Sequence, residues 1–342
     1  MAMNRYTKWA YWLITLLIIT LMAMIISSGI GSAKISPIRI IRIILNNMPF
    51  INLEKDWEDS EELALMEWRL PRIIISAVIG SGLALSGVVF QALLRNPLAE
   101  PYILGVSSGG SLGAIIAIII GISAIKGIST LPLFAFIGSL STMFFVYSIA
   151  RIGGRVPTHT LLLAGVIVNA FFSAVIMFLV SITRESDTHK FLLWSMGNLS
   201  PADKGLTTTA MVLIIIGEII LYLYSNAFNL FSLGEESAKQ LGIEVEHVKK
   251  ISFILASLIT GASVSVCGII GFVGLIVPHA VRMIIGADHR IVMPASALTG
   301  ACFLVIADTI ARTITAPAEI PVGVVTALAG APFFIYLLRR KP

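Results

Sequence analysis

The chain consists of long apolar runs separated by short polar connections, from its first residues to its last. A helix needs about 20 apolar residues to cross the hydrocarbon core of a bilayer. By that measure the pattern predicts ten membrane-spanning helices, near residues 9–29, 69–92, 104–122, 131–150, 159–182, 206–226, 249–268, 272–286, 291–311 and 321–338. The sequence therefore predicts an all-α polytopic membrane protein that forms a single transmembrane domain over residues 1–342.

Composition supports this fold class. Of the 342 residues, 57% are hydrophobic and 13% are charged, and the mean hydropathy is +0.93. A soluble domain carries roughly a quarter of its residues as charges. The net charge of +5 comes from Lys and Arg between the spans, without a basic face interleaved with aromatics, so the expected partner is the lipid bilayer and not nucleic acid. Cys267 and Cys302 both lie in apolar runs and are predicted to be free thiols.

The distribution of charge predicts the orientation of the chain. The first apolar run follows Arg5 and Lys8 and has no small-residue cleavage site after it, so it is interpreted as a span and not as a signal peptide. Lys and Arg are slightly more frequent in the connections that share a side with the N-terminus, and the chain ends in Arg339, Arg340 and Lys341. Both termini are therefore expected on the cytoplasmic side of a plasma membrane.

Two connections are long enough to have structure of their own. The outer one, residues 30–68, contains SPIRIIRIILNN and is expected to place one apolar stripe of a helix, formed by Ile38, Ile41, Ile44 and Leu45, along the outer membrane surface. The inner one, residues 227–249, contains a short helix bracketed by two glycines and carrying an apolar side of Leu233, Ala238 and Leu241.

A faint internal repeat is also present. Gly87 precedes Pro97 by ten residues, and Gly268 precedes Pro278 by ten residues, at the ends of two predicted spans that cross in opposite directions. Inverted repeats with broken helices near the pathway are typical of transporters. The similarity consists of only one glycine and one proline at the same spacing in each region. A true inverted repeat and a coincidence therefore remain equally open alternatives.

The stretch RNPLAEPYILGVSSGG, residues 95–110, interrupts the apolar pattern. Its GVSSG fits the nucleophile elbow G-x-S-x-G, which needs a preceding strand and a positioned base, so an intramembrane serine protease using Ser107 or Ser108 with His279 is a remote alternative. Gly105, Gly109 and Gly113 instead repeat every four residues, as in the small-residue ridges that allow membrane helices to pack closely.

No motif for binding nucleotide phosphates occurs, and neither does H-E-x-x-H or Cys-x-x-Cys, so neither ATPase activity nor a metal site is expected in this chain. Active transport would need an ion gradient or a partner ATPase. Only two acids, Glu218 and Asp308, lie clearly within spans, fewer than an ion-coupled carrier is expected to have. Asp308 precedes Arg312 by four residues and is expected to form a structural ion pair with it, in preference to a proton relay. Glu218 is expected to make an interior hydrogen bond.

Arginines open the second span at its outer end, in the sequence Arg69-Leu70-Pro71-Arg72. They either anchor the helix at the lipid headgroups or present guanidinium groups to carboxylates of a delivery protein. The residues alone favour the anchoring interpretation.

Five long strings then resemble one family in order. RLPRIIISAVIGSGLALSGVVFQALLRNPLAEPYILGVSSGGSLGA, LLLAGV, LGEESAKQLG, GFVGLIVPHAVRMIIGADHR and EIPVGVVTALAGAPFFIYLL resemble the signatures of the FecCD family of ABC-transporter permeases, from about Arg69 to the C-terminus. The region of residues 30–68, with its acid-rich string DWEDSEE, is not placed by the resemblance.

The resemblance implies a function. FecCD permeases import iron(III)-siderophores, haem or cobalamin by alternating access. Two permease copies, expected here to form a homodimer, dock two cytoplasmic ATPase subunits, which bind ATP and magnesium, and receive cargo from an extracytoplasmic binding protein. The permease itself has no cofactor and no catalytic residues. A gradient-driven secondary transporter is the main alternative class.

The resemblance also assigns roles to residues. It implies that Arg69, Arg72 and Arg312 dock the binding protein and that Asn96 and Leu98 form an inner gate. Thr158 and His159 fall at a second gate element, where the histidine departs from the small hydroxyl residues usual in the family. The segment that couples to the ATPase comprises Leu233, Gly234, Glu235, Glu236, Ala238, Gln240, Leu241 and Gly242. Movement of this segment is expected to tilt the surrounding spans, while the walls of the pathway do not specify which chelate is carried.

Overall fold

The computed structural model describes residues 5–31, 35–49, 51, 53–121, 124–125, 128–200 and 203–339. Arg340 and Lys341, two of the basic residues from which a cytoplasmic C-terminus is predicted, lie outside the described residues, as do residues 32–34, 50 and 52 of the outer connection.

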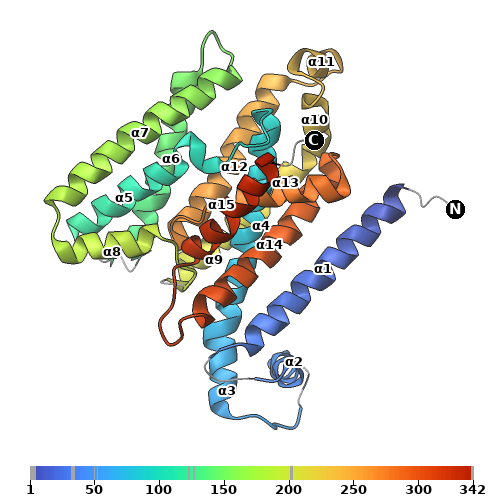
Figure 1. Cartoon of the computed structure of the whole chain (residues 1–342), viewed down its shortest axis with the longest axis vertical. Helices are drawn as coiled ribbons and strands as arrows, with labels where there is room; N and C mark the ends of the chain where they lie inside the picture. Colours follow the sequence, from blue (N-terminus) through green and yellow to red (C-terminus); the bar gives the residue numbers. More distant parts are fainter. Residues whose placement is uncertain are drawn as a thin grey trace.

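All ten predicted spans are helices, arranged as a bundle (Figure 1). They are α1 (Arg5–Gly29), α4 (Leu70–Leu93), α5 (Val106–Ile120), α6 (Thr130–Ala150), α7 (Thr158–Ile182), α9 (Lys204–Leu223), α12 (Val245–Cys267), α13 (Val273–Ile285), α14 (His289–Thr313) and α15 (Val322–Arg339). Within the described part of the chain, seven helices are long and apolar enough to cross a membrane, and α5, α13 and α15 are shorter apolar helices. The prediction of an all-α polytopic membrane protein is confirmed.

Shorter elements connect the spans. They are α2 (Pro37–Asn46), α3 (Asp59–Leu63), the π-helical segment η1 (Ala64–Arg69), the 3-10 helix η2 (Pro101–Leu104), the hairpin of β1 (Ala124–Ile125) and β2 (Ile128–Ser129), α8 (Glu185–Ser195), α10 (Ser225–Phe231) and α11 (Glu235–Gln240). Helices α2 and α3 lie at one end of the bundle and α11 at the other (Figure 1). We call these the α2 end and the α11 end.

Helix α4 forms the centre of the bundle, with α9, α12, α13 and α14 packed around it. Glycines allow the closest of these contacts, because a side chain on Gly80 of α4 would collide with the backbone of Gly300 in α14, and the reverse is also true. In a membrane this close van der Waals packing takes over the role that the hydrophobic effect has in water.

Helices α5 and α6 pack in the same manner. A Cβ atom on Gly109 would meet Thr142 and Gly138 of α6, and one on Gly113 would meet the carbonyl of Phe134. Gly105 differs from these two, because it precedes α5 as its N-cap with a left-handed φ of +85°. All three glycines of the expected ridge therefore face α6, two from within α5 and Gly105 from the turn before it.

The outer connection forms a small core of its own. Ile40 and Ile43 of α2 are fully buried and pack with Trp57 and Leu65. Ile38, which the sequence pattern placed on the apolar stripe, is 73% exposed. Helix α2 therefore has two apolar sides, one packed within the outer connection and one exposed. Of the predicted stripe, Ile44 packs against the buried cluster, whereas Ile38 and Ile41 are exposed.

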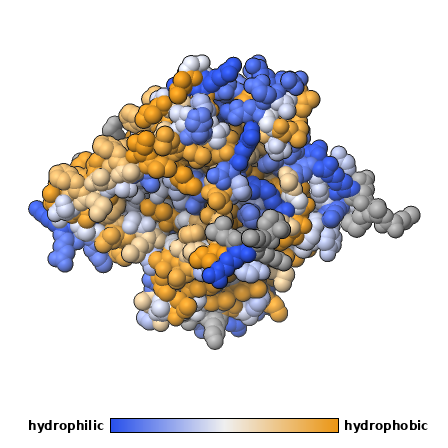
Figure 2. All heavy atoms as spheres, turned by 45° about the horizontal axis from the view of Figure 1, so that its top comes forward, coloured by the Kyte–Doolittle hydropathy of each residue, from blue (hydrophilic) through white to orange (hydrophobic). Residues whose placement is uncertain are grey.

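The surface has the apolar character of a membrane protein. Figure 2 shows hydrophobic residues over broad areas of the face that it presents. On α7, the large side chains of Phe171, Met177 and Phe178 are all more than 60% exposed, at 63%, 73% and 62%. Exposed apolar area of this extent requires lipid or another protein chain to cover it.

The proposed repeat of glycine and proline does not hold at the residue level. Gly87 lies inside α4 whereas Gly268 follows the end of α12, and Pro97 lies between helices whereas Pro278 lies inside α13. The four residues therefore do not occupy equivalent places. What the two regions share is a long helix, a non-helical segment and a short helix, in α4–α5 and in α12–α13.

Candidate functional site

The first break in the helical pattern begins at the end of α4. The helix ends at Leu93, before either proline, and Arg95 adopts a left-handed φ of +47°. A left-handed residue is a common way for a helix to end, although it is usually glycine. The Asn96 side chain then accepts a hydrogen bond of 2.9 Å from the Leu98 N–H, and Leu98 is 43% exposed. Pro101 begins η2, so it starts the next element and does not end the previous one.

The second break, residues 268–272 between α12 and α13, is bonded to the first. The Glu100 carboxylate accepts a 2.7 Å hydrogen bond from the Phe272 N–H at the start of α13. The Tyr102 hydroxyl donates to the Ile270 carbonyl at 2.9 Å. Non-helical backbone is tolerated at membrane depth only where protein or a water-filled cavity satisfies it. Glu100 and Tyr102 provide these partners, and the sequence reasoning missed them although they are the acid and the phenol inside the interruption.

Two of the four predicted gate residues, Asn96 and Thr158, border different cavities. Asn96 borders a pocket of about 350 Å³ at the α11 end, together with Arg95, Arg282 and His289. Thr158, at the first position of α7, borders a narrow gap beside Leu94 at the end of α4. His159 is exposed and does not border either of these two cavities. The structure thus brings Thr158, but not His159, next to the end of α4.

The serine motif does not have the geometry of a nucleophile elbow. A 3-10 helix, η2, precedes it where the elbow needs a strand. The Ser108 hydroxyl is buried and donates a 3.0 Å hydrogen bond to the Gly105 carbonyl of its own turn. Among the described residues, no group of three or more His, Cys, Asp or Glu side chains is placed to hold a metal ion.

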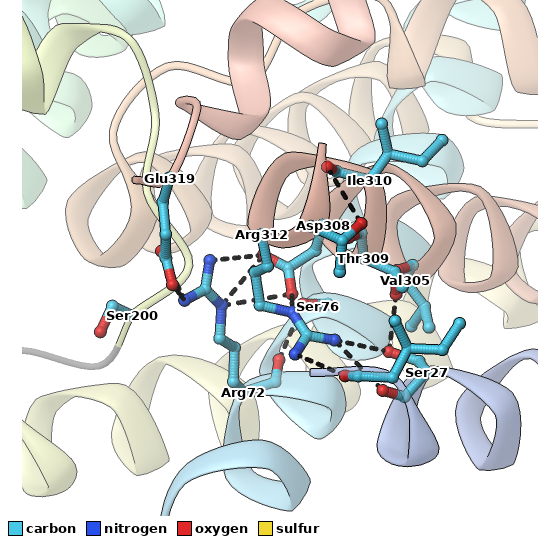
Figure 3. A network of polar contacts seen from close by, with 12 residues as sticks. Ser27, Arg72, Ser76, Ser200, Val305, Asp308, Thr309, Ile310, Arg312 and Glu319 are labelled. Atoms are coloured by element: carbon cyan, nitrogen blue, oxygen red, sulfur yellow. Dashed lines mark hydrogen bonds and ion pairs between the residues drawn. The ribbon is translucent and has the colours of Figure 1, made fainter. Parts of the chain in front are cut away.

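The arginines at the α2 end surround one buried aspartate (Figure 3). The Arg72 guanidinium lies 2.9 Å from Asp308 and 2.9 Å from Glu319. Arg312 lies 3.2 Å from Asp308 and donates to the Ser27 carbonyl at 3.2 Å. The predicted ion pair of Asp308 with Arg312 is confirmed, and Arg72, which is 236 residues away in sequence from Asp308, completes the cluster.

These arginines point into the protein. The side chains of Arg72 and Arg312 are 12% and 10% exposed, and Asp308 is 1% exposed. Arg69 is buried at 7% exposure and donates a 2.9 Å hydrogen bond to the Ser28 carbonyl at the end of α1. The three arginines lie at one end of the bundle, as predicted, but their guanidinium groups face inward and not outward.

Helix α11 is bracketed by two glycines with left-handed φ, Gly234 at +107° and Gly242 at +88°. Ala238 is fully buried, whereas Leu233 and Leu241 are 64% and 61% exposed. The three residues therefore do not form one apolar side, because the alanine faces the protein and the two leucines face away from it. The polar residues Glu236 and Gln240 are also exposed. The expected short helix is present, and its leucines are uncovered.

Glu218 lies in α9, within the bundle. Its Oε1 atom is buried in the bundle and has no hydrogen-bond partner among the described residues. The Ser81 side chain of α4 is hydrogen-bonded to the Glu218 carboxylate, which is the interior hydrogen bond that the sequence suggested. Cys267 and Cys302 are free thiols, as predicted.

Known proteins resemble this chain over most of its length. Residues 16–340 match the FecCD transport family. The cobalamin import system permease protein of Halobacterium salinarum is 46% identical over 274 residues, which cover 80% of this chain and 72% of that protein. The hemin transport system permease protein of Yersinia pestis is 42% identical over 275 residues, which cover 80% of this chain and 82% of that protein.

A solved structure shares the fold. It shows an inward-facing conformation of a metal-chelate type ABC transporter, with a TM-score of 0.82, 31% sequence identity, and coverage of 96% of this chain and 99% of that one. The chain is therefore a multi-pass permease subunit of a prokaryotic ABC importer and not an ATPase, and such a subunit works with ATPase and binding-protein partners. These matches, together with ten helices broken and packed as described, show that the chain belongs to the FecCD transport family.

Proposed function

We propose that this permease carries a metal chelate, of the class that includes ferric siderophores, haem and cobalamin, from an extracytoplasmic binding protein into the cytoplasm. The observation that supports this cargo class best is the similarity over most of the chain to permeases named for cobalamin and hemin. Residues 1–342 act as one membrane domain in this proposal. ATP and magnesium are bound by the partner ATPase, and the permease holds no cofactor of its own.

The two ends of the bundle are assigned to different partners. The α11 end faces the cytoplasm and the ATPase, with both termini on that side, and residues 30–68 lie on the extracytoplasmic side. The exposed Leu233 and Leu241 support this assignment, because two uncovered leucines beside a short helix suit a groove in a partner. The contact region is the segment of eight residues from Leu233 to Gly242 named above.

Two copies of the chain form the pathway between them. The exposed face of α7, with Phe171 and Met177, supports a second copy as the cover for part of this surface. Asn96 and Leu98 act as the inner gate, and Thr158 acts as a second gate element beside the end of α4. Alternating access would open and close these elements as α11 moves.

The arginine cluster at the α2 end is the docking site for the binding protein. Arg72 is the member best placed for exchange, because its second partner, Glu319, is 49% exposed. A carboxylate of the binding protein can replace Glu319 while Asp308 continues to hold Arg72. Arg69 and Arg312 support the cluster from within, through their bonds to the end of α1.

Reconstitution tests the proposed function directly. Vesicles that contain the permease and its ATPase are expected to take up one of the three chelate classes only when ATP and the binding protein are both present. Uptake by ATPase-free vesicles under an ion gradient would overturn the proposal in favour of a secondary carrier. Loss of function in Ser108→Ala without any dependence on ATP would favour the protease alternative instead.

The docking assignment needs a separate variant. Arg72→Gln is expected to reduce stimulation of ATP hydrolysis by the binding protein and to leave basal hydrolysis unchanged. Lys204→Gln is the matched control, because Lys204 is an 83% exposed cation at the same end that pairs with Glu67. Equal stimulation of the Arg72→Gln variant and the control would show that the cluster is structural only.

A further inference from the structure

A lysine in the first turns of α12 joins α11 to the segment that precedes α7. The Lys249 ammonium lies 2.6 Å from the Glu235 carboxylate of α11, and the lysine side chain is only 10% exposed. The same ammonium donates a long hydrogen bond of 3.5 Å to the carbonyl oxygen of Val156. Glu246 accepts a hydrogen bond of 3.3 Å from the Val156 N–H. Both backbone polar groups of Val156 are therefore held by α12.

The lysine is the main polar attachment of α11. Among the described residues, the bond of Lys249 to Glu235 is the only salt bridge between α11 and the membrane-spanning helices. The other charged side chains of α11, Glu236 and Lys239, are exposed, and Ala238 contributes only a buried methyl group. Among the polar contacts of α11 in the described part of the chain, the pair of Glu235 and Lys249 would therefore carry movement of α11 to α12.

The segment on the other side of the lysine leads directly to a gate residue. Residues 151–155 form a tight turn in which Ile152 and Arg155 exchange backbone hydrogen bonds. Val156 follows this turn and is buried. Pro157 then caps α7 with φ near −63°, and the proline ring fixes that angle. Thr158 comes next and borders the gap beside Leu94, so a displacement of Val156 passes through one stiff residue to Thr158.

We propose that Lys249 is a positioning residue that transmits movement of α11 to the Thr158 end of α7, through Glu235 on one side and Val156 on the other. The inference rests on the proposed function, because it assumes that the ATPase moves α11. The physical reason is the burial of the ammonium group. Separating a mostly buried cation from its carboxylate leaves an uncompensated charge, so Glu235 and Lys249 are expected to move together.

The test uses the full transporter with its ATPase and binding protein in vesicles. Lys249→Met is expected to leave binding of the ATPase subunit and ATP hydrolysis in place while the chelate taken up per ATP falls about tenfold, within the usual range of coupling between two sites. Lys249→Arg keeps the charge and is expected to restore most of the uptake. Lys250→Met is the matched control, because the neighbouring lysine is exposed.

A second measurement separates transmission from simple stability. In a Thr158→Cys background, the rate of reaction with a thiol reagent is expected to change between the nucleotide-free and ATP-bound states. The added Lys249→Met change is expected to abolish that difference. Glu235→Gln, at a position that is 35% exposed, removes the same link from the α11 side if Lys249→Met fails to fold.

Two results would overturn the proposal. One is normal uptake per ATP in both Lys249→Met and Glu235→Gln, and the other is an unchanged nucleotide response at position 158 in these variants. Failure of the proposed function would look different, because the wild-type transporter itself would then show no ATP-dependent uptake of any of the chelates.

Discussion

At the α2 end, Arg72 and Arg312 close around Asp308, which is 1% exposed. At the α11 end, one ammonium group, that of Lys249, holds a carboxylate that is 35% exposed, and the leucines beside α11 are uncovered. The first arrangement buries its central charges within one chain and leaves only Glu319 exposed, whereas the second leaves the leucines on both sides of α11 for a partner to cover. Stability differs from place to place within a protein, and elements that must move belong to its less stable parts. The comparison therefore assigns rigidity to the α2 end and movement to the α11 end.

The strongest test of the rigid end removes its aspartate. Asp308→Ala leaves Arg72 and Arg312 buried without their shared carboxylate and is expected to lower the free energy of unfolding by about 3–5 kcal/mol. Denaturant unfolding in mixed micelles measures the change. Asp187→Ala is the control, because its pair with Lys190 is a surface pair of i,i+3 spacing, and such pairs contribute about 0.5 kcal/mol. If both variants lost the same free energy of unfolding, the α2 end could not be called more rigid than the α11 end.

Substitutions at the α11 end are expected to weaken binding of the ATPase subunit and to leave the stability of the permease unchanged. Leu233→Ser and Leu241→Ser are each expected to weaken binding of the ATPase subunit about tenfold, since burying a leucine contributes roughly 1.5–3 kcal/mol. The unfolding midpoint should stay unchanged, because both side chains are exposed. Affinity of the ATPase for the permease in nanodiscs provides the measurement. Leu63→Ser, at a 58% exposed leucine of the α2 end, serves as the control for added polarity.

A smaller effect should separate the two carboxylates that Arg72 contacts. Glu319→Gln is expected to change the free energy of unfolding by less than about 1 kcal/mol, because pairs with an exposed partner contribute little. Glu319 is 49% exposed whereas Asp308 is 1% exposed. The same unfolding experiment compares the two. A loss for Glu319→Gln as large as that for Asp308→Ala would show that burial does not decide the strength of these pairs.

The smallest expected effect is a pH dependence of the outer connection. Hydrogen bonds from Asn47, then from Trp57 and Lys55, lower the pKa of Glu62 from 4.5 to about 2. A carboxylate whose pKa is lower in the folded state stabilises the fold above its unfolded value, and this stabilisation is lost as the pH falls. Contacts around Trp57 should therefore weaken between pH 4.5 and about 2. The pH dependence of Trp57 fluorescence, in a variant with Trp57 as its sole tryptophan, would measure this weakening. The added change Glu62→Gln is expected to reduce the dependence of the fluorescence on pH.

The helices were predictable because the bilayer sets their length. Ten apolar runs became ten helices, with ends that shifted by a few residues where local chemistry decided, as at Leu93, which ends α4 before either proline. The pair of Asp308 with Arg312 was predictable for a similar reason, since a spacing of four residues places both on one helix face.

What the sequence did not reveal depends on contacts between distant segments. Arg72 meets Asp308 across 236 residues, and Lys249 meets Val156 across 93. No periodicity relates such positions. The inward direction of the arginines follows from the first contact, and the split of the α11 leucines from Ala238 follows from how α11 lies on its neighbours. The residues of the candidate site could therefore be predicted from the sequence, but the directions in which their side chains point could not.

The bonds of Glu100 and Tyr102 to the second break have a consequence for how this protein can change over evolutionary time. Surface loops usually accept inserted or deleted residues at little cost in free energy, because water satisfies whatever backbone groups are displaced. Side chains of the first break instead satisfy the backbone of the second break. A change of length in residues 94–105 would leave amides of residues 268–272 unsatisfied, so this loop should tolerate insertions as poorly as a buried helix does.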